Sequence, residues 1–489
     1  RDPFGIKPLF YRYEEGRLDF ASEVPAILEL LENKPKPNWQ NIYDYLVWAR
    51  YDHKETTFFE GISHLLPGHF FKISLNEKQT ISLKRWWWPS IHEQSDITFD
   101  QASEQLREMF LNSVQLHMRS DVPIGAALSG GLDSSAVVSA MNHIDPNSEI
   151  HTFSYVARNS SINEEKWIDI MNNSVGAIPH KVVVSPNDIL GDLDDLILLQ
   201  GEPFASTSIY AQYRVFQAVK EEGIVVTLDG QGADELLAGY WGYPHARLKT
   251  LINQMHLKDA FDFSAAWTKR HNMPWKEIIN PAVTASISPE IVFSLMKLFK
   301  TQPPKWIDQK WCNDNGVKLN SIYNWRSDLK ENKTRVLSNM LRSALTGKMG
   351  LVHLLRHEDR NAMRWSVESR VPFLNTEIAN FTLSLPERFL VSDTGQTKNI
   401  FRSAMKDIVP DIILNRQDKI GFETPETEWL KQFSPQLKEW LSSENHLPII
   451  DKEMSIKWFN ETINNKQASS LQLWRLINLS RWHKVYFEN

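Results

Sequence analysis

The segment PIGAALSGGLDSSAVVSAMN (Pro123–Asn142) decides the fold of this chain. An apolar strand ends at Leu128, the loop SGGLDSS follows, and an apolar helix begins at once. Two adjacent glycines, which lack Cβ atoms, let the backbone come close to a bound group. The helix N-terminus and the serine hydroxyls offer hydrogen-bond donors at the same place. The segment therefore predicts a cradle for a phosphate or another oxyanion.

The acidic residue of this loop predicts a metal ion. The loop has neither the lysine and glycine spacing of a Walker A loop nor that of a G-x-G-x-x-G fingerprint. Asp133 would repel a phosphate unless a cation lay between them, which indicates Mg²⁺ held by the carboxylate and by phosphate oxygens. The alternative is a serine-capped turn without a ligand, but a cap does not require two glycines.

The surroundings of this segment, from Phe99 to about Tyr240, alternate apolar strands with helices. This alternation predicts a doubly wound parallel sheet that binds its ligand outside the carboxyl ends of the strands. After Tyr240 the strand signals fade and helical stretches run to Asn489. We expect strands over Val122–Leu128, Ile150–Val156, Lys181–Val184 and Ile224–Leu228, a helix over 101–118, and helices that begin near Asp133, Asn163 and Tyr210.

A second strand leads into a glycine-rich acidic loop in GIVVTLDGQGADELLAGYWGY (Gly223–Tyr243). This loop carries Asp229, Asp234 and Glu235. If both strands belong to one parallel sheet, both loops emerge at the same edge, and Asp133 and Asp234 face one metal-phosphate group. Two unrelated turns with solvated acids are the alternative.

The first stretch, RDPFGIKPLFYRYEEGRLDFASEV (Arg1–Val24), has the pattern of a β-hairpin with its turn at Glu14–Gly16. A helical run follows over Asn41–Tyr51, and the polar stretch SIHEQSDITFD indicates a domain boundary before Phe99. The chain opens on Arg in what resembles the middle of a domain, so we expect a fragment of a longer protein.

Composition limits the classes of partner. A chain of 489 residues with 42% hydrophobic and 23% charged residues predicts two or three globular domains. A net charge of −6 without a basic stripe argues against a nucleic-acid partner. The single cysteine, Cys312, excludes a disulfide framework. No apolar run or signal-peptide pattern predicts a membrane partner, so we expect a cytoplasmic protein. No sequence feature decides the oligomeric state, and a homodimer is compatible with it.

Several motifs together resemble one family. The loop Ser129–Ser134 matches the SGGxDS loop of ATP pyrophosphatases. With Gly230–Tyr240 it resembles the synthetase domain of glutamine-dependent asparagine synthetase, class B type. EDRNAMRWSVESRVPFLN (Glu358–Asn375) and NRQDKIGFETP (Asn415–Pro425) are similar to two later segments of that family. The opening hairpin resembles the end of its amino-terminal glutaminase domain.

The resemblance implies a domain organisation and a fold. Residues 1–90 would be the C-terminal remnant of an α+β N-terminal-nucleophile glutaminase domain with its linker, and most of that domain would be missing. Residues 99–489 would form the asparagine synthetase domain. Within it, residues 99–240 would be a nucleotide-binding α/β part of the adenine nucleotide alpha hydrolase type, and residues 241–489 would be mainly helical.

The resemblance also implies a reaction and its residues. The side-chain carboxylate of aspartate attacks the α-phosphate of ATP to give β-aspartyl-AMP and pyrophosphate with Mg²⁺. Ammonia, supplied by glutamine in the full-length protein, then displaces AMP. Lys419 would contact the phosphates. Arg360 would contact the acidic substrate, with a structural ion pair to Glu358 or Glu368 as the alternative. The resemblance assigns pyrophosphate to Ser129, Gly130, Gly131, Asp133 and Ser134, Mg²⁺ to Asp133 and Asp234, and adenosine to Leu128, Tyr155, Asp229 and Gly230.

One departure from the family concerns the ammonia step. Gln231 stands where the family has a glutamate that orients or deprotonates ammonia, and an amide cannot accept that proton at neutral pH. Glu358 is our candidate for the replacement base. The change also leaves two alternatives open, an adenylating amidotransferase for a sugar, peptide or β-lactam-precursor carboxylate and a catalytically silent nucleotide-binding relative.

The sequence also bears on the source of ammonia. Family glutaminases use an amino-terminal cysteine as nucleophile, and no cysteine stands in that position here. We therefore expect the chain as given to use free ammonia and not to hydrolyse glutamine.

Overall fold

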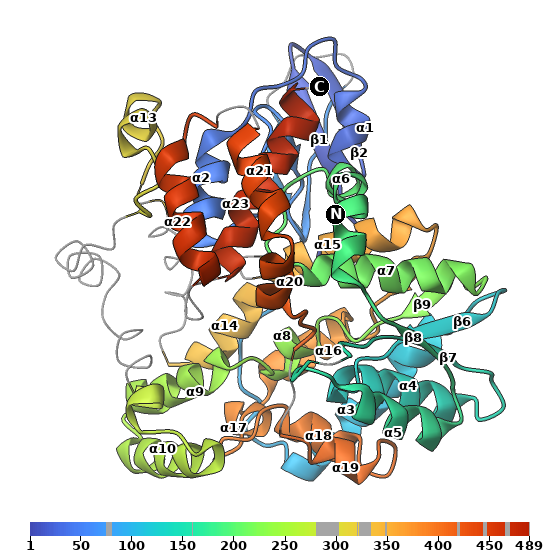
Figure 1. The fold of residues 1–489 in the computed structure, drawn as a ribbon. Coiled ribbons are helices and arrows are strands. Elements are labelled where there is room, and N and C mark those ends of the chain that lie inside the picture. The colour runs from blue at the N-terminus through green and yellow to red at the C-terminus, as the bar shows by residue number, and fades with distance from the viewer. Residues whose placement is uncertain are drawn as a thin grey trace.

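The computed structural model contains a five-stranded parallel sheet, whose labelled strands lie on the right-hand side of the molecule in Figure 1. Its strands, in the spatial order β10-β9-β6-β7-β8, are β6 (Ile124–Ala127), β7 (His151–Tyr155), β8 (Ile178–Val182), β9 (Val226–Leu228) and β10 (Glu368–Arg370). The first strand of this sheet along the chain is β6, which lies in the middle. The next two, β7 and β8, lie on one side of it, and β9 and β10 lie on the other. This order confirms the predicted doubly wound sheet and places the topological switch point between β6 and β9.

The fifth strand corrects the sequence prediction. The expected strands before Tyr240 are present, although β8 begins at Ile178, ahead of the predicted start at Lys181. The part after Tyr240 is mainly helical as predicted, but it also contributes a strand that the sequence did not indicate, because β10 pairs with β9 in the register Glu368↔Val226. The helical half of the chain thus supplies one edge of the parallel sheet.

Helices cover both faces of this sheet. α4 and α5 lie on one face, and α7 and α15 lie on the other (Figure 1). α3 begins where Thr98 and Gln101 cap each other reciprocally, as expected for a helix start of this type. The helices of this part are α3 (Phe99–His117), α4 (Leu132–Ile144), α5 (Glu165–Val175), α6 (Pro186–Gln200), α7 (Ser208–Glu221) and α8 (Ala233–Leu237).

The structure describes residues 1–74, 81–158, 160–279, 303–319, 321, 334–347, 350–417, 421–443, 447–464 and 470–488.

The predicted hairpin forms part of a small antiparallel sheet. β1 pairs with β2 from Phe10↔Ala21 to Glu14↔Arg17, and β1 also pairs with β3 on its other side. α2 follows an Asn38 cap and ends at Trp48, and the next residue, Ala49, has a left-handed φ of 55°. The elements are β1 (Phe10–Glu14), β2 (Arg17–Ala21), α1 (Val24–Leu28), α2 (Trp39–Trp48), β3 (Ser63–His64), β4 (His69–Phe70) and β5 (Lys84–Arg85).

The described residues after Tyr240 are helical apart from β10 and the loops. The helices up to the one that precedes β10 are α9 (Gly242–Asn253), α10 (Leu257–His271), α13 (Gln309–Asp314), α14 (Val336–Leu345) and α15 (Leu351–Arg364). Those after β10 are α16 (Thr376–Ser384), α17 (Glu387–Leu390), α18 (Asn399–Ala404), α19 (Asp411–Leu414), α20 (Glu426–Gln432), α21 (Ser434–Ser443), α22 (Lys452–Asn464), α23 (Ser470–His483) and a π-helical turn at Lys484–Glu488.

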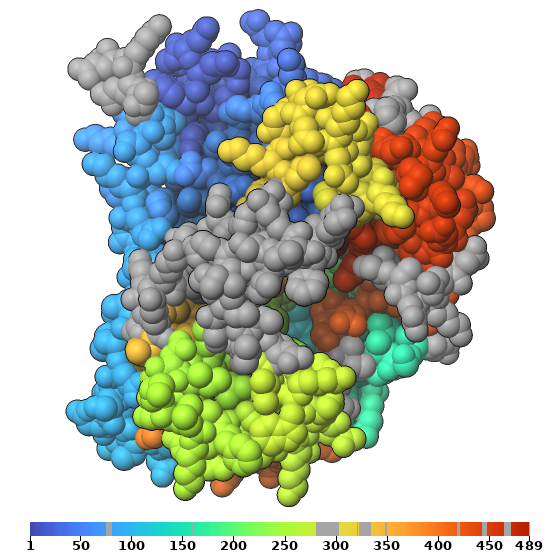
Figure 2. All heavy atoms as spheres, turned by 90° about the vertical axis from the view of Figure 1, so that its left-hand side faces the viewer, coloured from blue at the N-terminus to red at the C-terminus, as the bar shows by residue number. Residues whose placement is uncertain are grey.

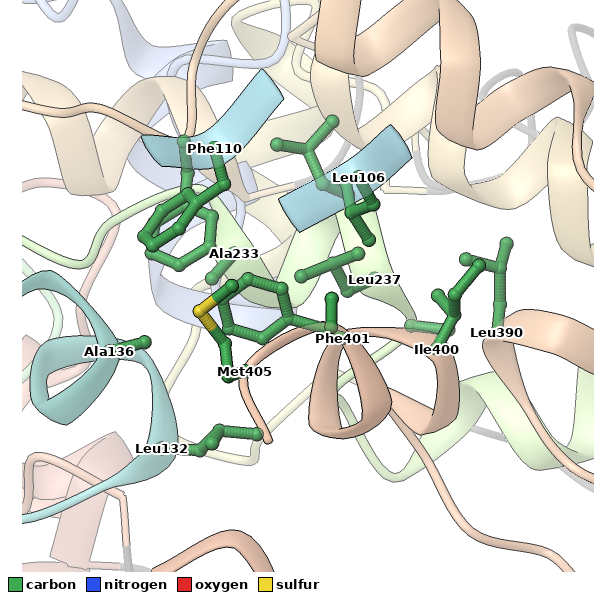
Figure 3. Close-up of a cluster of buried hydrophobic side chains, with 14 of the residues drawn as sticks. Leu106, Phe110, Leu132, Ala136, Ala233, Leu237, Leu390, Ile400, Phe401 and Met405 are labelled. Carbon is green, nitrogen blue, oxygen red and sulfur yellow. The ribbon is translucent and has the colours of Figure 1, made fainter. Parts of the chain in front are cut away.

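Two large hydrophobic clusters hold these elements together. One joins α3, α4 and α8 to α17 and α18, and Phe110, Phe401 and Met405 lie close together within it (Figure 3). The other joins the N-terminal segment to the last helices and includes Tyr45 and Trp482. The N-terminal segment and the C-terminal helices accordingly lie at one end of the molecule, with α9 and α10 at the other (Figures 1 and 2).

Candidate active site

The loops that follow β6 and β9 meet at the carboxyl edge of the sheet. The two strands are neighbours in the register Gly125↔Thr227, so α4 and α8 begin side by side. A pocket of about 290 Å³ opens there. Residues predicted from the sequence that line it are Leu128, Ser129, Asp133, Ser134, Tyr155, Asp229, Gly230, Gln231 and Asp234. Residues that the prediction did not include are Ala127, Phe153, Gln212, Val215, Phe216, Tyr240, Leu354, Gly421 and Phe422.

The serines of the first loop are bonded to one another. The backbone N–H of Ser129 donates to Ser134 Oγ at 3.1 Å, and the two Oγ atoms are also 3.1 Å apart. Gly130 has a φ of +73°, and a Cβ there would lie 2.7 Å from Trp167 Cβ. Gly131 is the N-cap of α4, and its N–H lies 3.4 Å from Ser129 Oγ. The loop is therefore a tight turn whose hydroxyls and N–H groups are gathered at the start of a helix.

The second loop packs directly against the first. A Cβ on Gly230 would lie 3.0 Å from the backbone N of Ser134 and 3.2 Å from the carbonyl carbon of Asp133. Backbone atoms cannot move aside as a flexible side chain can, so glycine at this position allows the two loops to approach. The family-like glycine at 230 thus has a packing cause in this chain.

Both acidic residues assigned to Mg²⁺ contact one buried lysine. Lys398 Nζ lies 2.6 Å from Oδ1 and 2.6 Å from Oδ2 of Asp133, and it also forms an ion pair with Asp234. The Lys398 side chain is 5% exposed. Lys398 is the N-cap of α18, and the sequence analysis missed it because a lysine in GQTKNIF has the pattern of a solvated surface residue.

The contacts with this lysine show whether the two carboxylates lie close enough together to bind one metal ion. Asp133 and Asp234 converge closely enough to neutralise a single cation. Mg²⁺ in nucleotide sites is usually held by one or two carboxylates, phosphate oxygens and waters, so this pair fits a nucleotide-bound Mg²⁺. Within the described part of the chain, no group of three or more His, Cys, Asp or Glu could hold a metal by itself.

The environment of the second loop raises the pKa of two carboxyl groups. Burial, reinforced by the charge of Asp133, raises the pKa of Asp229 to about 6, although the backbone N–H of Gln231 donates to it. Burial and the adjacent Asp234 raise the pKa of Glu235 to about 7, and Tyr240 donates its hydroxyl to this carboxylate at 2.8 Å. Acidic side chains from both loops therefore gather at this edge of the sheet, where a cationic or metal-bound ligand would favour their ionised forms.

One wall of the pocket is apolar. Leu128, Tyr155 and Phe422 lie along it, and the rings of Tyr155 and Phe422 are 5.8 Å apart at 64°. Flat aromatic and aliphatic surfaces beside a phosphate cradle suit a purine base. The pocket thus has a polar and an apolar part, as a nucleotide requires.

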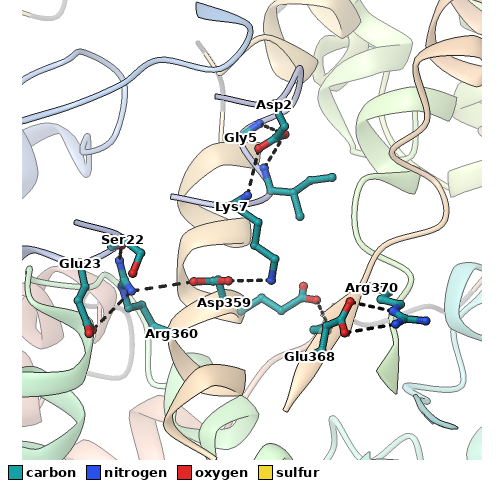
Figure 4. Close-up of polar contacts among 12 residues, drawn as sticks. Asp2, Gly5, Lys7, Ser22, Glu23, Asp359, Arg360, Glu368 and Arg370 are labelled. Atoms are coloured by element: carbon teal, nitrogen blue, oxygen red, sulfur yellow. Dashed lines mark hydrogen bonds and ion pairs between the residues drawn. The ribbon is translucent and has the colours of Figure 1, made fainter. Parts of the chain in front are cut away.

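The remaining predicted residues lie elsewhere. Glu358 on α15 is buried, accepts a hydrogen bond from Ser369 of β10, and does not belong to the pocket lining. Burial and the charge of Asp229 raise the pKa of Glu358 well above its usual range. Arg360 donates to the carbonyl of Ser22 and pairs with Glu23 at 3.6 Å, so it faces the N-terminal segment (Figure 4). Lys419 lies outside the described residues.

This arrangement defines an α/β protein with a nucleotide-sized pocket at its switch point, and comparison with known proteins specifies the family. Residues 105–484 match the family model Asparagine synthase, and residues 1–87 match Glutamine amidotransferase domain. The first match covers well over half of the chain, and the chain belongs to the asparagine synthase family. No helix in the described ranges is long and apolar enough to cross a membrane.

Curated relatives align over the whole chain. Asparagine synthetase [glutamine-hydrolyzing] 1 of Bacillus subtilis (strain 168) is 25% identical over 503 residues, which cover 100% of this chain and 75% of the relative. Asparagine synthetase [glutamine-hydrolyzing] 3 of the same organism is 24% identical, covering 99% and 76%. A putative asparagine synthetase [glutamine-hydrolyzing] of Mycobacterium bovis (strain ATCC BAA-935 / AF2122/97) is 26% identical, covering 100% and 74%.

Proposed function

We propose that the chain is an ATP-dependent amide ligase that converts aspartate into asparagine through β-aspartyl-AMP. The observation that carries this proposal is the convergence of Asp133 and Asp234 on one cation beside the SGGLDSS loop. Two carboxylates and a donor-rich loop at one point stabilise a pyrophosphate leaving group with its counter-ion better than a neutral ground state. Membership of the asparagine synthase family supports the same reaction.

Each part of the pocket takes one part of the nucleotide. The backbone N–H groups and hydroxyls of the loop Ser129–Ser134, with Gly130 and Gly131 at its centre, would hold the β- and γ-phosphates. The apolar wall at Leu128 and Tyr155 would hold adenosine, next to the backbone of Asp229 and Gly230. Lys419 is proposed to contact the phosphates during adenylation.

The metal role falls to Asp133 and Asp234. When bound, Mg²⁺ would neutralise charge that develops on the leaving pyrophosphate. The two carboxylates would orient the phosphates against the loop so that the α-phosphate faces the attacking carboxylate of aspartate.

The ammonia step needs a proton acceptor. The amide of Gln231 lines the pocket and can hydrogen-bond ammonia but cannot take up its proton. We retain Glu358 as the proposed acceptor because its raised pKa makes the ionised carboxylate a stronger base than an ordinary glutamate. Arg360 keeps its proposed contact with the acidic substrate only as a secondary assignment, since its described partners belong to the N-terminal segment.

The domain organisation is also a proposal. Residues 1–90 would belong to a glutaminase domain that supplies ammonia from glutamine, and residues 99–489 would carry the ligase, with an α/β part at 99–240.

Pyrophosphate–ATP exchange tests the ligase proposal. We expect exchange that depends on aspartate, with asparagine formed when ammonium is added. Asp133→Asn should abolish exchange, whereas Asp121→Asn, an exposed residue before β6, should leave it unchanged. Absence of exchange with any carboxylate would overturn the proposal in favour of a silent nucleotide-binding protein.

Gln231 favours one alternative substrate class. The residue that differs from the family pattern lies in the pocket itself, where it would touch the acceptor or the amine. Exchange that depends on a sugar, peptide or β-lactam-precursor carboxylate and not on aspartate would establish a related adenylating amidotransferase.

A further inference from the structure

Lys398 occupies the position that the proposed metal would need. Its ammonium is within 2.6 Å of both oxygens of Asp133 and is ion-paired with Asp234. Its side chain is only 5% exposed, so this contact is shielded from solvent. A lysine of this kind holds its carboxylates more firmly than a surface ion pair does.

Two local features keep the lysine in this place. Its backbone has φ 53° and ψ 29°, the left-handed conformation that residues with a Cβ seldom adopt. At Gly239, an added Cβ would lie 2.3 Å from Lys398 Cε and 1.7 Å from Asp234 Oδ1, so only glycine leaves room for the ion pair. An uncommon backbone conformation that the surrounding structure enforces is typical of a functional position.

The ammonium and a divalent cation would compete for the same oxygens. Mg²⁺ binds oxygen ligands directly, and a second positive charge at the same carboxylates is strongly repelled. Arg402 adds further positive charge near Asp133. A metal ion can therefore enter only if the lysine finds another anion, and a polyphosphate offers both that anion and further ligands for the metal.

We propose that Lys398 is a built-in competitor of the metal. It neutralises Asp133 and Asp234 in the nucleotide-free enzyme, so the carboxylates bind a divalent cation only together with the polyphosphate of ATP. The displaced ammonium then pairs with a phosphate oxygen. The inference rests on the proposed function for the identity of the nucleotide, whereas the competition rests on the three side chains alone.

Binding of Mn²⁺ in the absence of nucleotide, followed by electron paramagnetic resonance, tests the competition. Lys398→Met should bind Mn²⁺ at least about tenfold more tightly than the wild type, because the competing charge is gone. Lys398→Arg should remain as weak as the wild type, and Lys406→Met, an exposed lysine after α18, should change nothing. A lysine with a purely structural role would give weaker Mn²⁺ binding in Lys398→Met, which would overturn the proposal.

The wild-type enzyme provides a second test that does not depend on the folding of a variant. Adding inorganic pyrophosphate should raise its Mn²⁺ affinity at least about tenfold. Tight Mn²⁺ binding by wild type without any phosphate, lost in Asp133→Asn, would overturn the proposal. Neither assay requires aspartate or turnover. Failure of aspartate-dependent exchange alongside the expected Mn²⁺ results would thus refute the proposed function and leave the competition standing.

Discussion

Arg356 donates from Nε to Oδ2 of Asp52 across 2.8 Å, and the two side chains are 2% and 7% exposed. Arg356 lies on α15, which also carries Asp359 and Arg360, and Asp52 follows α2 in the N-terminal segment. Lys7 of the same segment forms an ion pair with this helix, in which its Nζ lies 2.9 Å from Oδ1 of Asp359 (Figure 4). The helix that precedes β10 is thus tied to the N-terminal segment by one buried ion pair and by a second pair in which Lys7 is exposed.

Removing one partner of the buried pair should destabilise the whole chain. We expect Asp52→Ala to lower the free energy of unfolding by about 3–5 kcal/mol, because Arg356 would remain buried without its counter-ion. Urea denaturation measures the change, with Glu15→Ala in the exposed hairpin turn as the control. A loss below about 1 kcal/mol, the range of an exposed pair, would contradict this account.

Adding a Cβ at Gly230, where the loops after β6 and β9 meet, should slow pyrophosphate exchange. We expect Gly230→Ala to lower pyrophosphate exchange about 100-fold, because the backbone of Ser134 must shift by a fraction of an ångström. The matched control is Gly191→Ala in α6, where nothing lies within 4 Å of the added carbon. This control should keep full exchange and gain about 0.5–1 kcal/mol of stability. Equal exchange in both variants would show that the close contact between Gly230 and the backbone of Ser134 does not matter for the reaction.

The ammonia step can be separated from adenylation. We expect Glu358→Gln to lower amide formation by about 10²–10⁴-fold, the usual range for loss of a general base, while exchange changes little. Gln231→Glu, which restores an ionisable group in the pocket, should raise the ammonia-dependent rate in the same background. Full synthetase turnover in Glu358→Gln with intact adenylation would rule Glu358 out.

Glu202 should make stability depend on pH. Burial raises its pKa to about 7 from 4.5, against the opposing charge of Arg356. Below pH 4.5 the carboxyl is protonated in both folded and unfolded chains. Between pH 4.5 and 7 the unfolded chain releases the proton and the folded chain retains it, so stability is lost as pH rises. A shift of this size corresponds to about 3 kcal/mol.

Glu202→Gln isolates this effect. The amide oxygen can still accept from the backbone N–H of Phe58, which donates to Glu202 at 2.8 Å, but it does not ionise. His64 and His353, whose pKa values burial lowers to about 4, change stability in the opposite sense over part of the same range. The difference between variant and wild type in urea denaturation should therefore grow by about 3 kcal/mol between pH 4.5 and 7. Parallel profiles, as expected for the exposed control Glu60→Gln, would refute the assignment.

The sequence predicted those parts of the site that depend on local order. The paired glycines before Asp133 and the acidic loop after β9 each follow a strand at once, so periodicity and turn chemistry locate them. The hairpin of β1 and β2 was predictable for the same reason, since alternation and a turn lie within one short stretch.

Contacts between distant segments could not be predicted in this way. β10 is three residues long and gains its strand conformation from pairing with β9, a partner far away in the sequence. Lys398 stands directly between the polar residues Thr397 and Asn399, which gives no local sign that its side chain is buried, and only the folded chain brings it to Asp133. The burial of Glu358 likewise follows from packing of α15 on the sheet, which no local pattern expresses.

During synthesis on the ribosome, β10 is translated long after β9, the strand with which it pairs. About 140 residues separate β9 from its outer neighbour, and at roughly 5–20 residues per second their translation takes about 7–28 s. During that interval β9 leaves the ribosome with one row of backbone N–H and C=O groups unpaired. The nascent parallel sheet thus exposes an unpaired strand edge for many seconds, and chaperone dependence or aggregation during expression should begin at this strand.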